Sequence, residues 1–185
     1  QGPFSMPDLP PAHRVVRKPE TGGKVPVTRV VVGYVVLGYD ERFLRRKRLM
    51  TAGDQGFMVD LPETSSVAAG DCFELMDGRL IEVRPAEEPV LIVTGDLPRL
   101  AWHIGNRHTP CQIEADHLII RTDHVLEAML TGLGATLAHV SEPFTPEGGA
   151  YGHGRTMGHD HGGHDHGQAT SGFELPASLR LGHGG

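Results

Sequence analysis

The longest apolar run in this sequence extends only from Val30 to Leu37, and it is rich in β-branched valine. A helix that crosses a membrane needs roughly 18 consecutive apolar residues, whereas a strand needs about 4 to 8. The run is therefore predicted to be a strand, and we expect no membrane partner. With 25 glycines and 14 prolines in 185 residues, the core must be small and the loops numerous.

Residues 25–86 have the pattern of an all-β module. After the valine run, short apolar segments recur at 57–59, 72–76 and 79–83. Leu61-Pro62 is expected to end the first of these segments, because proline cannot donate to a strand ladder. Asp77-Gly78 predicts a hairpin, since an Asp-Gly pair tolerates the positive φ angles of a type I′ turn.

The chain ahead of this module shows no periodicity. Residues 1–24 are predicted to be a mobile lead-in, rich in proline and charge, in which nothing is anchored. Residues 1–5, ahead of Met6, look like the scar left when an expression tag is cleaved. No charged segment followed by an apolar one begins the sequence, so we expect a cytoplasmic protein without a secretory signal.

A second domain is predicted over residues 87–150, after an acidic linker at 85–89. Val90–Val93 has the composition of a buried strand. Apolar residues at helical spacing predict two helices, the first capped by Asp96 and ended by Gly105-Asn106. The second helix is expected to begin after Thr122 or Asp123 and to stop at Gly134.

Three further strands are expected in this domain, at 111–115, 117–121 and 136–140. The resulting order β-α-β-β-α-β is the split βαβ, ferredoxin-like arrangement. The predicted fold class is therefore α+β, with an N-terminal all-β module, a ferredoxin-like domain and a flexible histidine-rich tail.

The tail, residues 151–185, is predicted to be flexible because glycine recurs throughout its first half. Its candidate metal ligands are His153, His159, His161, His164 and His166, with Asp160 and Asp165 between them. Imidazole suits nickel, zinc and copper alike, so the pattern predicts metal binding without selecting the metal. The alternatives are a solubilising low-complexity segment and a purification tag, although tags are usually unbroken histidine runs.

Three histidines of the second domain are further candidates. His103 and His108 lie five residues apart, so they would not share a face of a continuous helix. Because the helix is expected to end at Gly105-Asn106, His108 should stand on an exposed turn. A lone histidine holds an ion poorly unless a two-fold axis places its symmetry mate beside it. For His108, a dimer-bridging metal site and a histidine without a ligand role both stay open. For His124, the start of the second helix favours a neutral ring that could bind metal, and a surface histidine near the N-cap is the alternative.

Other classes of function are disfavoured. Cys72 and Cys111 form no CxxC pattern, which indicates reduced thiols, and Cys111 is more typical of a packed side chain than of a thiolate ligand. The net charge of −6 disfavours a nucleic-acid partner. The basic run of Arg42 and residues 45–48 predicts a solvated face or a protein contact. No HExxH, GxSxG or P-loop pattern occurs, so we do not expect an enzyme.

Three motifs of the second domain, in this order and spacing, resemble the UreE family of urease accessory metallochaperones. They are Trp102-His103-Ile104-Gly105-Asn106-Arg107-His108-Thr109-Pro110-Cys111-Gln112-Ile113, Asp123-His124-Val125-Leu126 with Met129-Leu130, and the stretch from Pro143 to His153. The β module is similar to the family's first domain at Arg42, 45–48, 57–61, Gly70-Asp71 and 77–79. The resemblance covers residues 25 to 166.

This resemblance implies a homodimer that delivers Ni(II) to apo-urease through a partner GTPase. It implies that His108 of each subunit forms an interfacial site, and that His103 and His124 match the additional internal metal sites of some members. Zn(II) and Cu(II) are alternatives at the same ligands. The alternative function is a general histidine-rich nickel, zinc or copper buffer without a dedicated client. A metal-dependent hydrolase, the third hypothesis, would need three fixed ligands and a closed pocket.

Overall fold

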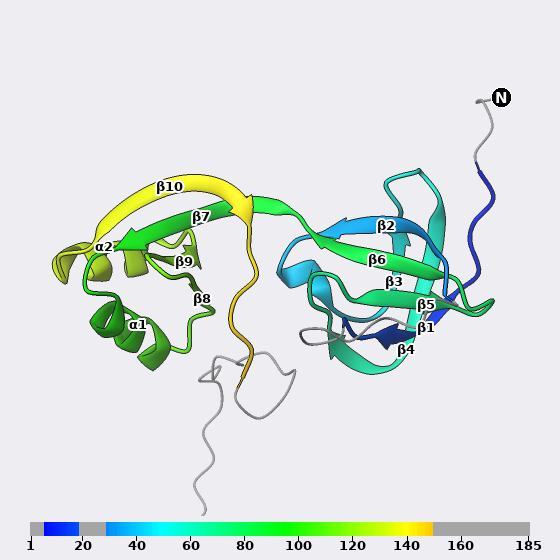
Figure 1. Ribbon diagram of the computed structural model, residues 1–185, viewed down its shortest axis with the longest axis horizontal. Helices are drawn as coiled ribbons and strands as arrows, with labels where there is room; N and C mark the ends of the chain where they lie inside the picture. Colours follow the sequence, from blue (N-terminus) through cyan, green and yellow to red (C-terminus); the bar gives the residue numbers. More distant parts are fainter. Residues whose placement is uncertain (1–5, 19–28, 150–185) are drawn as a thin grey trace, which may run out of the picture.

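The computed structural model describes residues 6–18 and 29–149. The predicted cleavage scar at 1–5 and the predicted tail, with all five of its candidate histidines, lie outside the described residues. Within them the chain is a mixed α+β structure of two lobes, each built on one sheet (Figure 1). No helix in this part of the chain is long and apolar enough to cross a bilayer.

The first lobe is a six-stranded sheet in the order β2-β6-β5-β1-β4-β3. Its strands are β1 (Ala12–Val16), β2 (Val31–Leu37), β3 (Phe43–Met50), β4 (Gly56–Ser66), β5 (Cys72–Leu75) and β6 (Leu80–Pro85), with the 3₁₀ helix η1 (Asp40–Arg42) before β3. The pairs β1–β4 and β2–β6 are parallel and the other pairs are antiparallel. Phe57, Val59 and Phe73 lie at the centre of its core, each at most 1% exposed.

The second lobe is a four-stranded antiparallel sheet in the order β10-β7-β9-β8, with two helices. Its elements are β7 (Glu87–Thr94), α1 (Leu97–Asn106), β8 (Gln112–Ile113), β9 (Leu118–Arg121), α2 (His124–Gly132) and β10 (Thr136–Pro143). The predicted alternation of strands and helices is therefore present. The side chain of Asp96 accepts a hydrogen bond from the Arg99 backbone N–H, and Asp123, not Thr122, caps α2.

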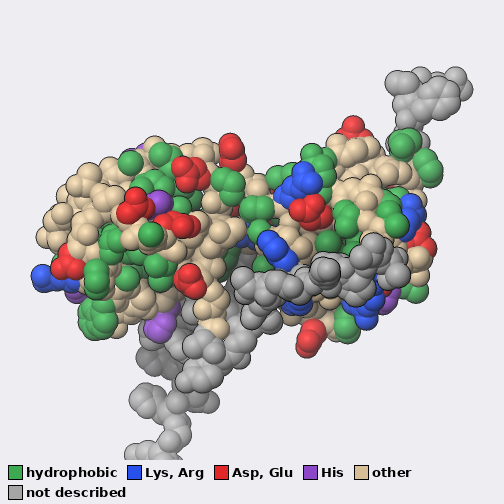
Figure 2. Space-filling model, in the orientation of Figure 1, with side chains coloured by type: hydrophobic (Ala, Val, Ile, Leu, Met, Phe, Trp, Pro, Cys, Tyr) green, Lys and Arg blue, Asp and Glu red, His purple; other side chains and the backbone are tan. Residues whose placement is uncertain are grey.

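Both faces of β7 are buried, as expected for a strand of this composition. Leu91 and Val93 pack with the helices, whereas Val90 packs with Ile119 and Phe144. The ring of Tyr39, from the first lobe, meets the ring of Phe144 edge-on at 5.5 Å. The two lobes therefore share a small apolar contact. On the face shown in Figure 2, most Lys and Arg side chains lie over the first lobe.

The prediction that nothing is anchored in residues 6–24 is wrong for 12–16. These residues form β1, which lies between β5 and β4 within the first sheet. Arg14 pairs with the buried carboxylate of Glu74. Because the charges of this segment are neutralised by residues about 60 positions away, no local pattern could identify the strand.

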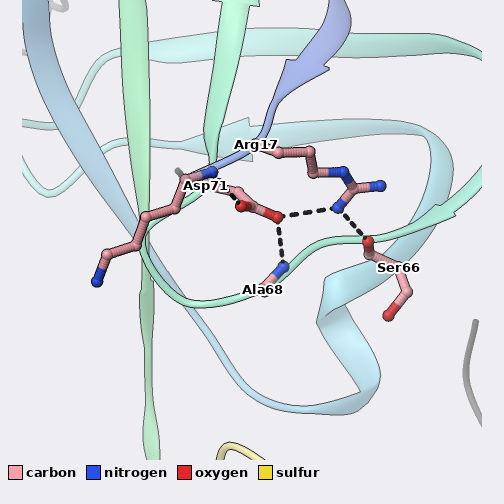
Figure 3. A network of polar contacts seen from close by, with 5 residues as sticks. Arg17, Ser66, Ala68 and Asp71 are labelled. Carbon is pink, nitrogen blue, oxygen red and sulfur yellow. Dashed lines mark hydrogen bonds and ion pairs between the residues drawn. The ribbon is translucent and has the colours of Figure 1, made fainter. Parts of the chain in front are cut away.

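A second carboxylate fastens the end of β1 (Figure 3). Asp71 is 3% exposed. It accepts hydrogen bonds from the Lys18 and Ala68 backbone N–H groups at 2.8 and 2.9 Å, and from the Arg17 guanidinium at 2.9 Å. The same guanidinium donates to the Ser66 carbonyl at 2.6 Å. Asp71 thus joins the end of β1 to the loop between β4 and β5.

Three further predictions need correction. The linker predicted at 85–89 is mostly strand, because β6 ends at Pro85 and β7 begins at Glu87. Pro62 does not end its strand, since β4 continues to Ser66 and the β3–β4 register shifts opposite Pro62, where no ladder hydrogen bond is required. Arg42 is not part of a solvated basic face, because it is buried and donates to the Leu37 and Phe144 carbonyls.

The hairpin at Asp77-Gly78 is confirmed, but its turn is not type I′. Among the described residues of this turn only Gly78 has a positive φ, of 87°. The Gly78 N–H donates to the Leu75 carbonyl at 2.9 Å, and the Leu75 N–H donates to the Arg79 carbonyl. This is the three-residue loop in which a left-handed glycine follows a type I turn.

We expect Asp71→Ala to lower the free energy of unfolding by about 2–3 kcal/mol, because the Lys18 and Ala68 N–H groups and the Arg17 guanidinium lose a buried, charged acceptor. Urea unfolding followed by circular dichroism measures the change. Asp60→Ala, at an exposed carboxylate on β4, is the matched control and should shift stability by no more than about 0.5 kcal/mol. Equal effects of the two substitutions would contradict an anchoring role for Asp71.

Candidate metal centre

His108 lies on the turn that ends α1, and its side chain is exposed. The His108 N–H donates to the Gly105 carbonyl at 2.9 Å, and the Thr109 N–H donates to the Ile104 carbonyl at 3.4 Å. These two bonds form a Schellman cap, in which the residue at the position of His108 takes a left-handed conformation. Its φ is accordingly 54°.

The second helix ends with the same cap, and there the position equivalent to His108 is occupied by glycine. Gly134 has a φ of 85°, its N–H donates to the Thr131 carbonyl, and the Ala135 N–H donates to the Leu130 carbonyl. Glycine takes this conformation without steric cost, whereas another L-residue pays about 1 kcal/mol or more. A histidine therefore occupies a position where the backbone favours glycine.

A cleft of about 440 Å³ adjoins this turn. It lies between the start of β7, the end of β9 and the start of α2, and its wall includes His108, Glu88, Arg121 and Asp123. The three charged residues already have partners: Glu88 accepts from the Tyr39 N–H, Arg121 pairs with Asp40, and Asp123 caps α2. Among the side chains of this wall, the imidazole of His108 is the nitrogen donor of the kind that suits first-row divalent metal ions.

The other two predicted ligands of the second lobe lie on different helices. His103 is half-buried on α1, with its ring edge-on to Trp102 at 4.9 Å. His124 is the first residue of α2 and is exposed. In the part of the chain that the structure describes, no group of three or more histidine, cysteine, aspartate or glutamate side chains could hold one metal ion.

Two histidines that the sequence did not single out carry carboxylate partners. The His139 Nε2 on β10 lies 2.8 Å from the Glu127 carboxylate on α2. His117 lies 2.6 Å from its neighbour Asp116, and this contact lowers the pKa of the Asp116 carboxyl. Adjacent residues could have suggested the second pair, but no local signal joins His139 to Glu127.

Neither Cys72 nor Cys111 ionises readily to a thiolate, because the pKa of each thiol is raised. Burial, with the nearby Glu147 carboxylate, raises the pKa of the Cys111 thiol to about 11. Burial also raises the pKa of Cys72, and the charges of Glu82 and Asp71 add to this effect. Since only the thiolate binds metal well, Cys111 is a poor ligand at neutral pH. Its side chain packs against the core of the second lobe, as the sequence predicted.

Two family models together match residues 14–170. The model described as the UreE urease accessory protein, N-terminal domain, matches 14–86, and the model of its C-terminal domain matches 87–170. A urease accessory protein UreE of Cereibacter sphaeroides is 64% identical over 85% of this chain and 83% of its own length. Those of Rhodobacter capsulatus and Paracoccus denitrificans are 66% and 68% identical, over 70% and 66% of this chain and 83% and 79% of their own lengths. The chain therefore belongs to the UreE family of urease accessory proteins, which assist urease and are not themselves enzymes.

Proposed function

We propose that this chain binds Ni(II) as cargo and delivers it to apo-urease while the urease active site is assembled. In this proposal the chain acts in the cytoplasm as a homodimer, together with a partner GTPase. Family membership supports the link to urease. The observation that carries the nickel site is His108, an exposed imidazole held on a left-handed turn at the edge of a cleft.

A two-fold axis would bring ligands from a second copy of the chain to the same ion. Pairing two chains at this turn would bring two fixed imidazoles to one ion, and the tail histidines could add more. Imidazole nitrogens suit Ni(II), and a site closed by exchangeable ligands can capture the ion and release it. Trp102, Ile113 and Val125 of the second lobe are more than half exposed, so they are available for a contact between two copies.

The finer fold assignments belong to the same proposal. We infer a ferredoxin-like second domain over 87–150, which the strand order β10-β7-β9-β8 and the element order support. The first domain would comprise 25–86 together with β1. Peripheral sites at His103 and His124 stay secondary in this scheme. Neither histidine belongs to a group of three or more potential ligands among the described residues.

The decisive substitution is His108→Gly, because glycine keeps the left-handed turn that alanine would strain. The free energy of unfolding should stay within about 1 kcal/mol of that of the unaltered chain, because glycine removes the conformational cost of the left-handed turn. The tightest nickel site should weaken by more than about tenfold, since each dimer loses both fixed nitrogen donors. Calorimetric titration with nickel measures the affinity, and urease activation by purified components at limiting nickel measures delivery.

His103→Ala and His124→Ala are the matched controls for this experiment, and both should retain delivery. If His108→Gly activates urease as well as the unaltered chain, while His124→Ala does not, delivery runs through a peripheral site. If nickel binding disappears with His108 but activation persists, the chain is a metal buffer and the delivery role fails.

The proposal uses nitrogen ligands for nickel and excludes the Cys111 thiolate, which can be tested separately through the raised pKa of this thiol. Alkylation by iodoacetamide proceeds through the thiolate, so its rate follows the ionised fraction. In a Cys72→Ser background, the rate at Cys111 in the folded protein should keep rising until about pH 11. In urea it should level off near the ordinary value for a free thiol. Nickel affinity should be the same in Cys111→Ser, and its loss there would make the thiolate a ligand.

A further inference from the structure

The cleft beside His108 carries charged groups of both signs. Its volume of about 440 Å³ falls in the range of small-molecule sites, roughly 300–1,000 Å³. Arg121 supplies a guanidinium to its wall, and Glu88 and Asp123 supply carboxylates. Proline and leucine side chains add apolar surface. A ligand that uses the whole wall must therefore present an anionic group as well as a cationic one.

The guanidinium of Arg121 is held in place by the first lobe. Its Nη1 donates to the Asp40 carboxylate at 2.8 Å, and the cation lies 4.8 Å from the centre of the Tyr39 ring. Within residues 6–18 and 29–149, no other hydrogen bond uses the N–H groups of this guanidinium. Arg121 can therefore keep its structural contacts and still donate to a carboxylate in the cleft.

The two carboxylates of the wall are held in a similar way. Asp123 makes both of its capping bonds to α2 through Oδ1, and Glu88 accepts from the Tyr39 N–H through Oε2. In the described part of the chain, the second oxygen of each carboxylate makes no hydrogen bond. Because structural bonds already order these side chains, a ligand would lose little affinity in fixing them.

We propose that the cleft binds an α-amino acid that chelates the nickel ion, so that nickel reaches His108 as an amino-acid complex. This inference rests on the proposed function, because it takes His108 as a nickel ligand. The amino nitrogen and one carboxylate oxygen of the amino acid bind the metal, and the carboxylate also accepts from Arg121. Glu88 and Asp123 attract the complex, since a nickel ion with one such ligand keeps a positive charge.

The number and kind of donors suit this metal. In the proposed dimer, the two His108 imidazoles supply two nitrogens and leave other positions on the ion open. One amino acid in each cleft adds a nitrogen and an oxygen. The resulting set of about four nitrogen and two oxygen donors is of the tetragonal N,O type that is typical of Ni(II). The complex then needs no protein ligand other than His108.

Retention of the amino acid by the full chain is the direct test. Equilibrium dialysis with radiolabelled free glycine, in the presence and absence of nickel, measures this retention. We expect about one to two glycine molecules for each bound nickel ion, and none without nickel. Absence of glycine from the nickel-loaded chain, or equal retention without nickel, would overturn the inference.

Arg121→Gln tests the contact with the carboxylate. It should weaken the nickel-dependent retention of glycine by at least about tenfold, because a charge-assisted hydrogen bond is lost. Ethylenediamine chelates nickel but has no carboxylate. With this chelator the same substitution should change nickel affinity by less than about twofold. Equal weakening with both chelators would indicate a structural role for Arg121 and would contradict the inference.

Asp40→Asn is the matched control, because it removes the charged partner of Arg121 and keeps an acceptor oxygen for its N–H. It should not weaken glycine retention. An equal loss in Asp40→Asn and Arg121→Gln would assign the effect to the contact between the lobes, and the inference would fail. Circular dichroism and thermal unfolding establish that each variant is folded.

The proposed function fails by a different result, namely if His108→Gly leaves nickel binding and delivery unchanged. If His108→Gly loses both while the unaltered chain never retains glycine, the proposed function stands and this inference alone is wrong.

Discussion

The placement of the two lobes depends on the hydrogen bonds that the guanidinium of Arg42 donates. It is 4% exposed and donates to the carbonyl of Leu37, at the end of β2, and to that of Phe144, after β10. The ring of Tyr39 lies 5.8 Å from the same cation. A buried charge must be compensated by hydrogen bonds, so these carbonyls cannot move away without a large cost in free energy. One cation thereby links the two lobes.

The candidate site lies on the second lobe, and packing on both faces of the second sheet fixes its position. Phe144 covers the face of the second sheet opposite to the helices, beside Val90 and Ile119. The other face holds α1 through Leu100 and Ile104, both of which are nearly fully buried. Because α1 is fixed along its buried stripe, its last turn is fixed as well, and the backbone of His108 is set by two hydrogen bonds within that turn.

Local signals predicted much of this fold, and their success has a common cause. Asp96, Asp123 and Gly134 act within one turn of the helix that each begins or ends, so neighbouring residues contain the whole interaction. The expectation that α1 ends at Gly105-Asn106 was close, because the helix ends at Asn106. The exposed turn at His108 followed from it.

The features that sequence reasoning missed depend on distant partners. β1 is held by Glu74 and Asp71, and Arg42 is buried by Phe144, which lies 102 positions away. Nothing near these residues in the sequence marks them as buried or paired. The proposed pairing of His108 with a symmetry mate would be of the same kind, since one chain would contain only half of that contact. Contacts between residues far apart in the sequence, or between two chains, can be identified only from the folded structure or the assembly.

The left-handed cap at His108 also bears on how such a site can change over evolutionary time. Both capping hydrogen bonds are made by the backbone, so the side chain at this position contributes nothing to them. Unbranched L-residues pay a conformational cost there of about 1–2 kcal/mol, asparagine and aspartate pay less, and β-branched residues pay more. The backbone thus restricts this position less than it would a buried one, and the side chain is open to selection for its chemistry. A ligand can be gained, lost or exchanged at this turn while the helix that presents it stays in place.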